Sequence, residues 1–101
     1  MNVSAIKKNF NLLGVEIKIF FTLALCADAN GIANVNKDKL SKYIKVSRQT
    51  IGKYMRTFAG CNILKYKYSG KTFFNPEFYY TGPEELRAKV QEDYLRFKSD
   101  V

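Results

Sequence analysis

The stretch Leu40–Phe58, LSKYIKVSRQTIGKYMRTF, decides the fold that the sequence predicts. Leu40 and Ile44 stand four residues apart, which places both on one face of a first helix. After a turn at Val46, Ser47 can cap a second helix by accepting hydrogen bonds from the free amides of its first turn. The apolar residues of this second helix recur at intervals of four and three, as a buried stripe does: Ile51, Met55 and Phe58. The sequence therefore predicts two helices joined by a tight turn.

The outer face of the second helix is rich in hydrogen-bond donors. Its polar residues, counted from the cap, are Ser47, Arg48, Gln49, Thr50, Lys53 and Arg56. Arginine can bind the guanine edge and glutamine the adenine edge, while lysine and arginine also bind phosphates. A helix pair whose second member is apolar inside and donor-rich outside is typical of a DNA-binding helix-turn-helix. An ordinary solvated face is the alternative, but Glu and Ala would serve that purpose better.

Positive charge is concentrated around this helix pair. The chain has 101 residues and a formal net charge of +8. Residues 37–71 contain ten lysines and arginines and one acidic residue, Asp38, so this segment alone carries +9. The flanking segments nearly cancel, with +1 over residues 1–36 and −2 over residues 72–101. Such localised charge favours binding to a polyanion over a general effect on solubility.

The rest of the chain places this pair in an α+β, mostly α, arrangement. Hydrophobic periodicity predicts helices over 4–12 and 15–28, a strand over 32–35, a β-hairpin turning at Ser69–Gly70, and a last helix over 83–98. Helix, helix, helix, hairpin is the order of a winged helix-turn-helix. We expect a single domain over residues 1–101, with the helix-turn-helix at 36–58, the wing at 62–75 and flanking N- and C-terminal helices.

The predicted wing carries lysines on both strands. Lys65, Lys67 and Lys71 lie on either side of its turn, where they can hold phosphates or enter a minor groove. They can equally protect a strand edge from pairing with another chain, and the two roles are compatible. Lys37 or Lys42, on the first helix of the pair, can add further phosphate contacts.

Several residue types are expected in the core. The aromatic residues that follow the second helix are assigned to it: Tyr66, Tyr68, Phe73, Phe74, Phe78, Tyr79 and Tyr80. Cys26 and Cys61 are expected there as reduced thiols. The nine residues of the mostly apolar run Ile19–Ala27 are too few to span a bilayer, so we expect a soluble cytoplasmic protein without a membrane partner.

No catalytic or metal-binding constellation is visible in the sequence. The chain has no histidine, no glycine-rich phosphate loop and only two separated cysteines. We therefore expect no enzymatic activity, no metal and no cofactor.

The last predicted helix has an apolar stripe with two alternative uses. Its members are Leu86, Val90, Tyr94 and Phe97. The stripe either packs back on its own domain or forms the interface of a homodimer. Dimers of helix-turn-helix proteins place two recognition helices in successive major grooves.

Two motifs carry a family resemblance. Val46–Ile51, VSRQTI, followed by a lysine-rich hairpin, resembles winged-helix regulators of the MarR and GntR kind. The continuation Phe73–Gly82, FFNPEFYYTG, resembles the end of the same domain in RepL-type replication and maintenance proteins of firmicute plasmids and their phage relatives. The similarity covers roughly residues 32–82, about half of the chain. It implies a role in replication control or initiation, or in transcription regulation.

The sequence thus predicts sequence-specific binding to double-stranded DNA. The alternative is a protein–protein adaptor or inhibitor, encoded by a phage or plasmid, that uses a winged-helix scaffold without reading DNA. Such an adaptor would bury its aromatic hairpin or the stripe of the last helix against a partner.

Overall fold

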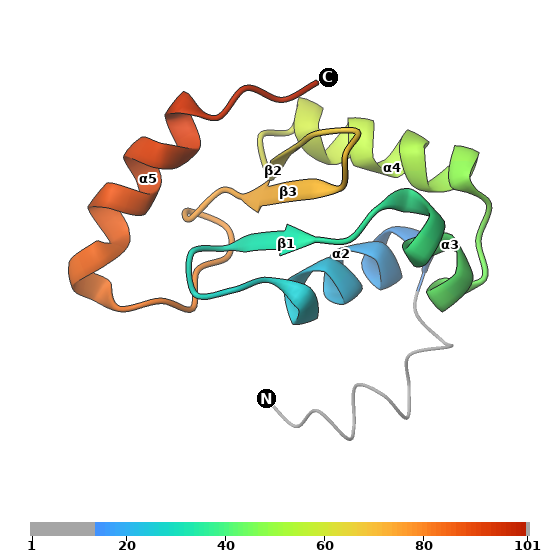
Figure 1. The fold of residues 1–101 in the computed structure, drawn as a ribbon, viewed down its shortest axis with the longest axis horizontal. Coiled ribbons are helices and arrows are strands. Elements are labelled where there is room, and N and C mark those ends of the chain that lie inside the picture. The colour runs from blue at the N-terminus through green and yellow to red at the C-terminus, as the bar shows by residue number, and fades with distance from the viewer. Residues whose placement is uncertain (1–13, 101) are drawn as a thin grey trace.

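Residues 14–100 are described by a computed structural model (Figure 1). The helix expected over residues 4–12 lies outside these residues. Along the chain the elements are α2 (Val15–Cys26), β1 (Ile32–Asn34), α3 (Lys37–Ile44), α4 (Arg48–Gly60), β2 (Leu64–Tyr66), β3 (Lys71–Phe74), the 3-10 turn η2 (Glu84–Leu86) and α5 (Arg87–Arg96). The chain is therefore an α+β protein, as the sequence predicts.

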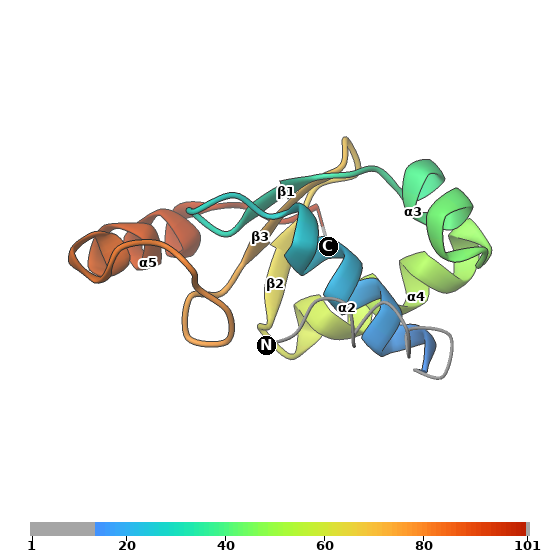
Figure 2. The same cartoon turned by 90° about the horizontal axis from the view of Figure 1, so that it is seen from below.

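The strands form one antiparallel sheet in the order β1–β3–β2. In the central strand β3, successive side chains point to opposite faces of the sheet. Phe74 faces α2 and α4, whereas Phe73 packs against Val90 and Tyr94 of α5. The sheet consequently lies between two layers, with α2, α3 and α4 on one side and α5 on the other (Figure 2).

The larger core lies between the sheet and the first three described helices. Its fully buried aliphatic side chains come from α2, α4 and the sheet: Ile19, Leu23, Ile51 and Leu64. Phe20 of α2 meets Phe74 edge-on, with ring centroids 5.3 Å apart. Leu40, Ile44 and Met55 are also buried in this core, so the apolar stripes predicted for the helix pair are confirmed.

Both predicted caps of the helix pair are present. The Asn36 side chain accepts a hydrogen bond from the Lys39 amide at 2.9 Å, and α3 begins at the next residue. The Ser47 hydroxyl accepts one from the Thr50 amide at 3.2 Å, and α4 begins at Arg48. The connecting turn reverses direction at Lys45, whose φ of 57° lies in the left-handed region.

The stripe of the last helix packs on its own sheet. Val90 and Tyr94 are buried, and Phe97 contacts Phe73 with ring centroids 5.6 Å apart. Only Leu86 remains exposed. Of the two uses that the sequence left open, the described fold therefore shows the intramolecular one.

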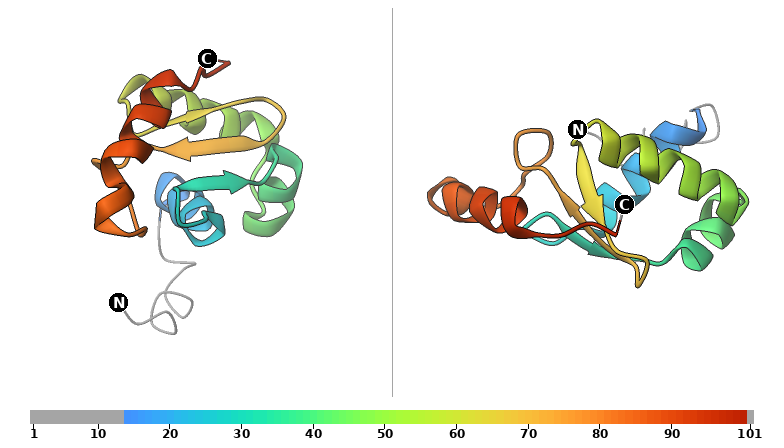
Figure 3. Two further views of the ribbon diagram at one scale, coloured as in Figure 1. Left: turned by 60° about the vertical axis from the view of Figure 1, so that its left-hand side comes forward. Right: turned by 90° about the horizontal axis from the view of Figure 1, so that it is seen from above.

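The segment after α5 runs along the free edge of β2 (Figure 3). The Asp100 amide donates to the Tyr66 carbonyl at 2.9 Å, and the Tyr68 amide donates to an Asp100 carboxylate oxygen at 2.9 Å. The Ser99 hydroxyl bonds both the amide and the carbonyl of Tyr66. This edge strand is thereby covered by the chain itself.

Four residues assigned to the core lie at the surface instead. Cys26 ends α2 and Cys61 follows α4, and both thiols are free and exposed because each sits where a helix leaves the core. Tyr68 is 65% exposed because it lies beyond the end of β2, in the hairpin turn. Phe78 is 59% exposed in the turn after β3. The core prediction is wrong for these four.

None of the helices described within residues 14–100 is long and apolar enough to cross a membrane.

Tyr94 supplies a prediction about stability. Burial raises the pKa of its phenol to about 12, and the hydroxyl donates to Asn62 Oδ1 at 2.7 Å. The neutral phenol is favoured in the fold, so stability falls as pH rises from about 10, the unfolded pKa, to about 12. Tyr94→Phe should cost about 1 kcal/mol at neutral pH. It should also remove the part of the alkaline loss of stability that Tyr94 causes, about 3 kcal/mol for a pKa raised from about 10 to about 12. Urea unfolding at stepped pH measures both effects, and parallel pH profiles for the two proteins would contradict the assignment.

Candidate nucleic-acid interface

The outer face of α4 is open to solvent. Arg48, Gln49 and Arg56 are exposed, as the sequence predicts for its outer face. The Arg48 guanidinium forms an ion pair, because its Nε lies 2.9 Å from the Asp38 carboxylate of α3. Both side chains of this ion pair are more than half exposed, so water screens it strongly.

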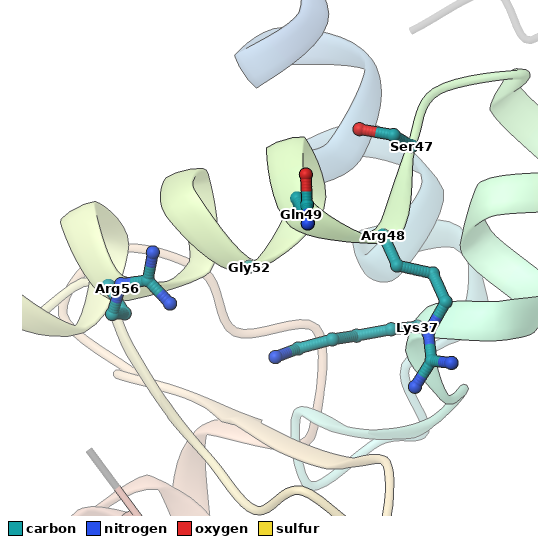
Figure 4. Close-up of a pocket in the computed structure, with 6 residues that line it drawn as sticks. All are labelled: Lys37, Ser47, Arg48, Gln49, Gly52 and Arg56. Carbon is teal, nitrogen blue, oxygen red and sulfur yellow. The ribbon is translucent and has the colours of Figure 1, made fainter.

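These side chains surround an open hollow of about 640 Å³ on the flank of α4 (Figure 4). Its lining residues come from the start of α3, from the cap of α4 and from one face of α4. They are Lys37, Ser47, Arg48, Gln49, Gly52 and Arg56. In Figure 4 the Lys37 side chain extends beneath α4 toward Gly52. Five of the ten site residues proposed from the sequence therefore line one surface.

Lys37 lies between this hollow and the hairpin. Its ammonium is 5.2 Å from the ring centroid of Tyr68 and 5.7 Å from that of Tyr66, distances typical of cation–π contacts. A second hollow of about 360 Å³, which shares Lys37 and Arg48 with the first, reaches the hairpin turn at Tyr68 and Ser69. The two hollows thus form a continuous basic surface from α4 to the hairpin turn.

The hairpin turn is held against the start of α3. The Val35 amide donates to the Gly70 carbonyl at 3.0 Å. Gly70 has a φ of +111°, and a Cβ on it would lie 3.0 Å from the Asn36 backbone nitrogen. Such an approach leaves no room for a side chain, so the glycine is required at this position.

The three hairpin lysines lie apart from the hollow and contact α5 and the segment after it. Lys65 is half-buried, donates to the Tyr94 carbonyl at 2.8 Å and lies 4.6 Å from the Tyr94 ring centroid. Lys67 and Lys71 are exposed, with ammonium groups 5.3 and 5.9 Å from the Phe97 ring centroid. Lys65 therefore supports the end of α5, whereas Lys67 and Lys71 remain accessible.

The other predicted residues also lie outside the hollow. The Thr50 hydroxyl is 2.9 Å from the Ser47 hydroxyl, so it is engaged at the helix cap. Lys53 is exposed further along α4, with its ammonium 5.9 Å from the Tyr54 ring centroid. Lys42 is exposed on α3.

Sequence reasoning missed three residues of this surface. A glycine inside a helix costs about 1 kcal/mol relative to alanine, so Gly52 was a visible signal that something approaches α4 closely. Asp38 was noted only as an isolated acid, although its position in the first turn of α3 brings it to Arg48. Tyr68 was expected in the core because the apolar–basic alternation of residues 64–68 was read as one strand. In the structure β2 ends at Tyr66.

Tyr66 lies beneath the same surface. It is 2% exposed, and no residue of the described range bonds its hydroxyl. Burial raises the pKa of this phenol, the charges of Tyr68 and Asp100 raise it further, and the Arg56 guanidinium opposes them. The hydroxyl therefore stays protonated at neutral pH and can act as a donor.

Comparison of the chain with protein-family models, curated proteins and solved structures finds no match.

Gly70 supplies a prediction about the hairpin. Gly70→Ala should destabilise the fold by about 1–3 kcal/mol, because the new methyl group meets backbone atoms at a positive φ. Gly60→Ala is the matched control, since a Cβ on Gly60 meets nothing within 4 Å. Urea unfolding measures the stability, and hydrogen exchange of the Val35 amide reports whether the turn has left α3. Equal unfolding midpoints for the two variants would show that the close approach is unimportant.

Proposed function

We propose that this chain is a winged helix-turn-helix domain that binds double-stranded DNA in a sequence-specific way. The order of its elements supports this proposal, since α3 and α4 form a capped helix pair and β2 and β3 form the hairpin that follows it. The resemblance to RepL-type proteins favours a role in plasmid or phage replication control or initiation. Transcription regulation is the other role consistent with the same binding.

The observation that carries the proposal is the basic surface beside α4. Lys37, Arg48 and Arg56 come from two helices, and Gln49 adds the amide that suits an adenine edge. The surface is open, and its only acidic member is Asp38. Duplex DNA is a rod of negative charge whose grooves admit a helix, so it fits both the sign and the shape of this surface.

The proposed mechanism divides the contacts by chemistry. The start of α4 enters the major groove, where Arg48 and Gln49 read base edges and the cap at Ser47 and Thr50 meets the backbone. Affinity comes from cations that neutralise phosphates: Lys37, Lys53, Arg56, Lys67 and Lys71. Lys65 is left out of this set because its ammonium is engaged by the carbonyls at the end of α5.

The adaptor alternative has less exposed apolar surface for a protein partner than the sequence suggested. Val90 and Tyr94, the centre of the stripe it would use, are covered by the protein's own sheet. Tyr68 is the exposed aromatic residue of the hairpin, and it lies beside Lys37. An aromatic ring flanked by cations suits nucleic acid as well as a protein partner. The basic surface therefore favours DNA.

Salt dependence tests the electrostatic part of the proposal. If the phosphate-binding cations neutralise about five phosphates, the logarithm of affinity should fall against the logarithm of salt concentration with a slope of about −4.5. Fluorescence anisotropy with a labelled duplex of random sequence, at a series of sodium chloride concentrations, measures this slope. A nearly flat line would count against binding through the basic surface.

Variants of Arg48 and Lys67 test whether base reading and phosphate binding are carried by different residues. Arg48→Ala should lose about 1–3 kcal/mol on the preferred site and relax base choice at one position, because a bidentate contact is removed. Lys67→Ala removes the same charge but should weaken all sequences alike. Selection of bound sites from random duplexes, read by sequencing for each variant, separates the two effects. Equal loss of discrimination in both variants would refute the assignment.

A further inference from the structure

The ends of two cationic side chains approach each other beside Gly52. A Cβ on this residue would lie 3.3 Å from the Lys37 ammonium nitrogen and 3.5 Å from Nη1 of Arg56. The two nitrogens are therefore about 7 Å apart or less, a distance at which like charges repel even near a surface. The arrangement costs energy unless a negative group joins it.

No carboxylate of the described residues neutralises this pair. The ion pairs within residues 14–100 join Arg48 to Asp38 and Arg87 to Glu84. Lys37 contacts the faces of two tyrosine rings, which leave its charge in place. The two cations on the floor of the hollow are thus available to an anion from outside.

Tyr66 packs beneath one of the two cations. The Lys37 ammonium lies 5.7 Å from the Tyr66 ring centroid. The Tyr66 hydroxyl itself is closed to solvent and lines neither hollow. The ring therefore helps to hold Lys37 in its position beside Gly52.

We propose that one phosphate group of the bound duplex lies over Gly52, between the Lys37 ammonium and the Arg56 guanidinium. The absent side chain at position 52 leaves room for the ends of the Lys37 and Arg56 side chains to converge on one group. This inference rests on the proposed function and specifies how the duplex is placed.

The site fixes the course of one DNA strand. With α4 in the major groove, a strand that crosses Gly52 runs through the hollow between α4 and the hairpin turn. The hairpin turn, including Tyr68, then faces the adjacent minor groove. Phosphate contacts of this kind set the register of a recognition helix without reading sequence, so the Gly52 site would set the position from which Arg48 and Gln49 read bases.

A pair of glycine variants on α4 tests the proposal. In Gly52→Glu the new carboxylate lies four residues before Arg56, the favourable order for a helical ion pair, and can take the place of the phosphate. Gly60→Glu changes the net charge equally but lies at the far end of α4, in open space. Both are measured against the labelled duplex of random sequence.

The duplex measurements have three outcomes. We expect Gly52→Glu to bind about tenfold or more weakly than Gly60→Glu, with a salt slope shallower by about one, because one phosphate contact is lost. Equal affinities and equal slopes would overturn the inference while leaving the proposed function intact. A native protein that binds no duplex would overturn the proposed function itself.

Lysine acetylation of the native protein keeps the test independent of variant folding. Addition of the duplex should protect Lys37 from the reagent more strongly than Lys39, which is exposed on the same helix. Equal protection of the two amines would contradict a phosphate at Gly52.

Inorganic phosphate distinguishes the two sources of the anion. In amide NMR spectra, sodium phosphate should shift the Gly52 and Arg56 signals more than sodium chloride of equal ionic strength, and the duplex should abolish this difference. Saturable phosphate binding that persists in the presence of duplex would overturn the assignment to the DNA backbone and indicate a site for free phosphate.

Discussion

The contact between the hairpin turn and the start of α3 sets the geometry of the whole basic surface. Gly70 lies beside the Asn36 backbone with space for no more than a hydrogen between them, so the turn packs directly on the start of α3. The hydrogen bond from the Val35 amide to Gly70 reinforces this contact. Because Lys37 follows directly, its side chain is placed between the tyrosines of the hairpin and the flank of α4. If the hairpin were not held against α3, the site residues of α3, of α4 and of the hairpin turn would form three separate patches. In the structure they form one continuous surface.

The two-sided burial of β3 explains why some lysines are structural and others are accessible. Phe73 and Phe74 anchor opposite layers, so α5 must lie on the side of the sheet that Lys65 also faces. The end of a helix carries partial negative charge on its free carbonyls, and the Lys65 ammonium binds there. Its charge is thus used inside the domain, whereas the cations around α4 face a surface without such carbonyls.

Local rules predicted the helix pair well, and tertiary placement was the part that sequence alone did not reveal. The caps at Asn36 and Ser47 and the buried stripe of α4 follow from spacing within a few residues. The exposure of Tyr68 depends on where β2 ends, which the alternating pattern does not mark. The role of Lys65 depends on the position of α5, about thirty residues away in sequence. The cations of the site, including Lys37 of α3, were therefore predictable, while the approach of Lys37 to Gly52 and to the hairpin tyrosines required the fold.

Under the proposed function, the free protein gives up the Arg48–Asp38 ion pair when Arg48 reads a base. Both side chains are largely exposed, and pairs of this kind contribute about 0–1 kcal/mol. A bidentate arginine–guanine contact contributes about 1–3 kcal/mol of discrimination. Exchange of Asp38 for a guanine is therefore favourable for Arg48. At other bases no equal contact replaces the lost ion pair. In the proposed complex, the weakly bound acid beside Arg48 would therefore favour specificity more than affinity.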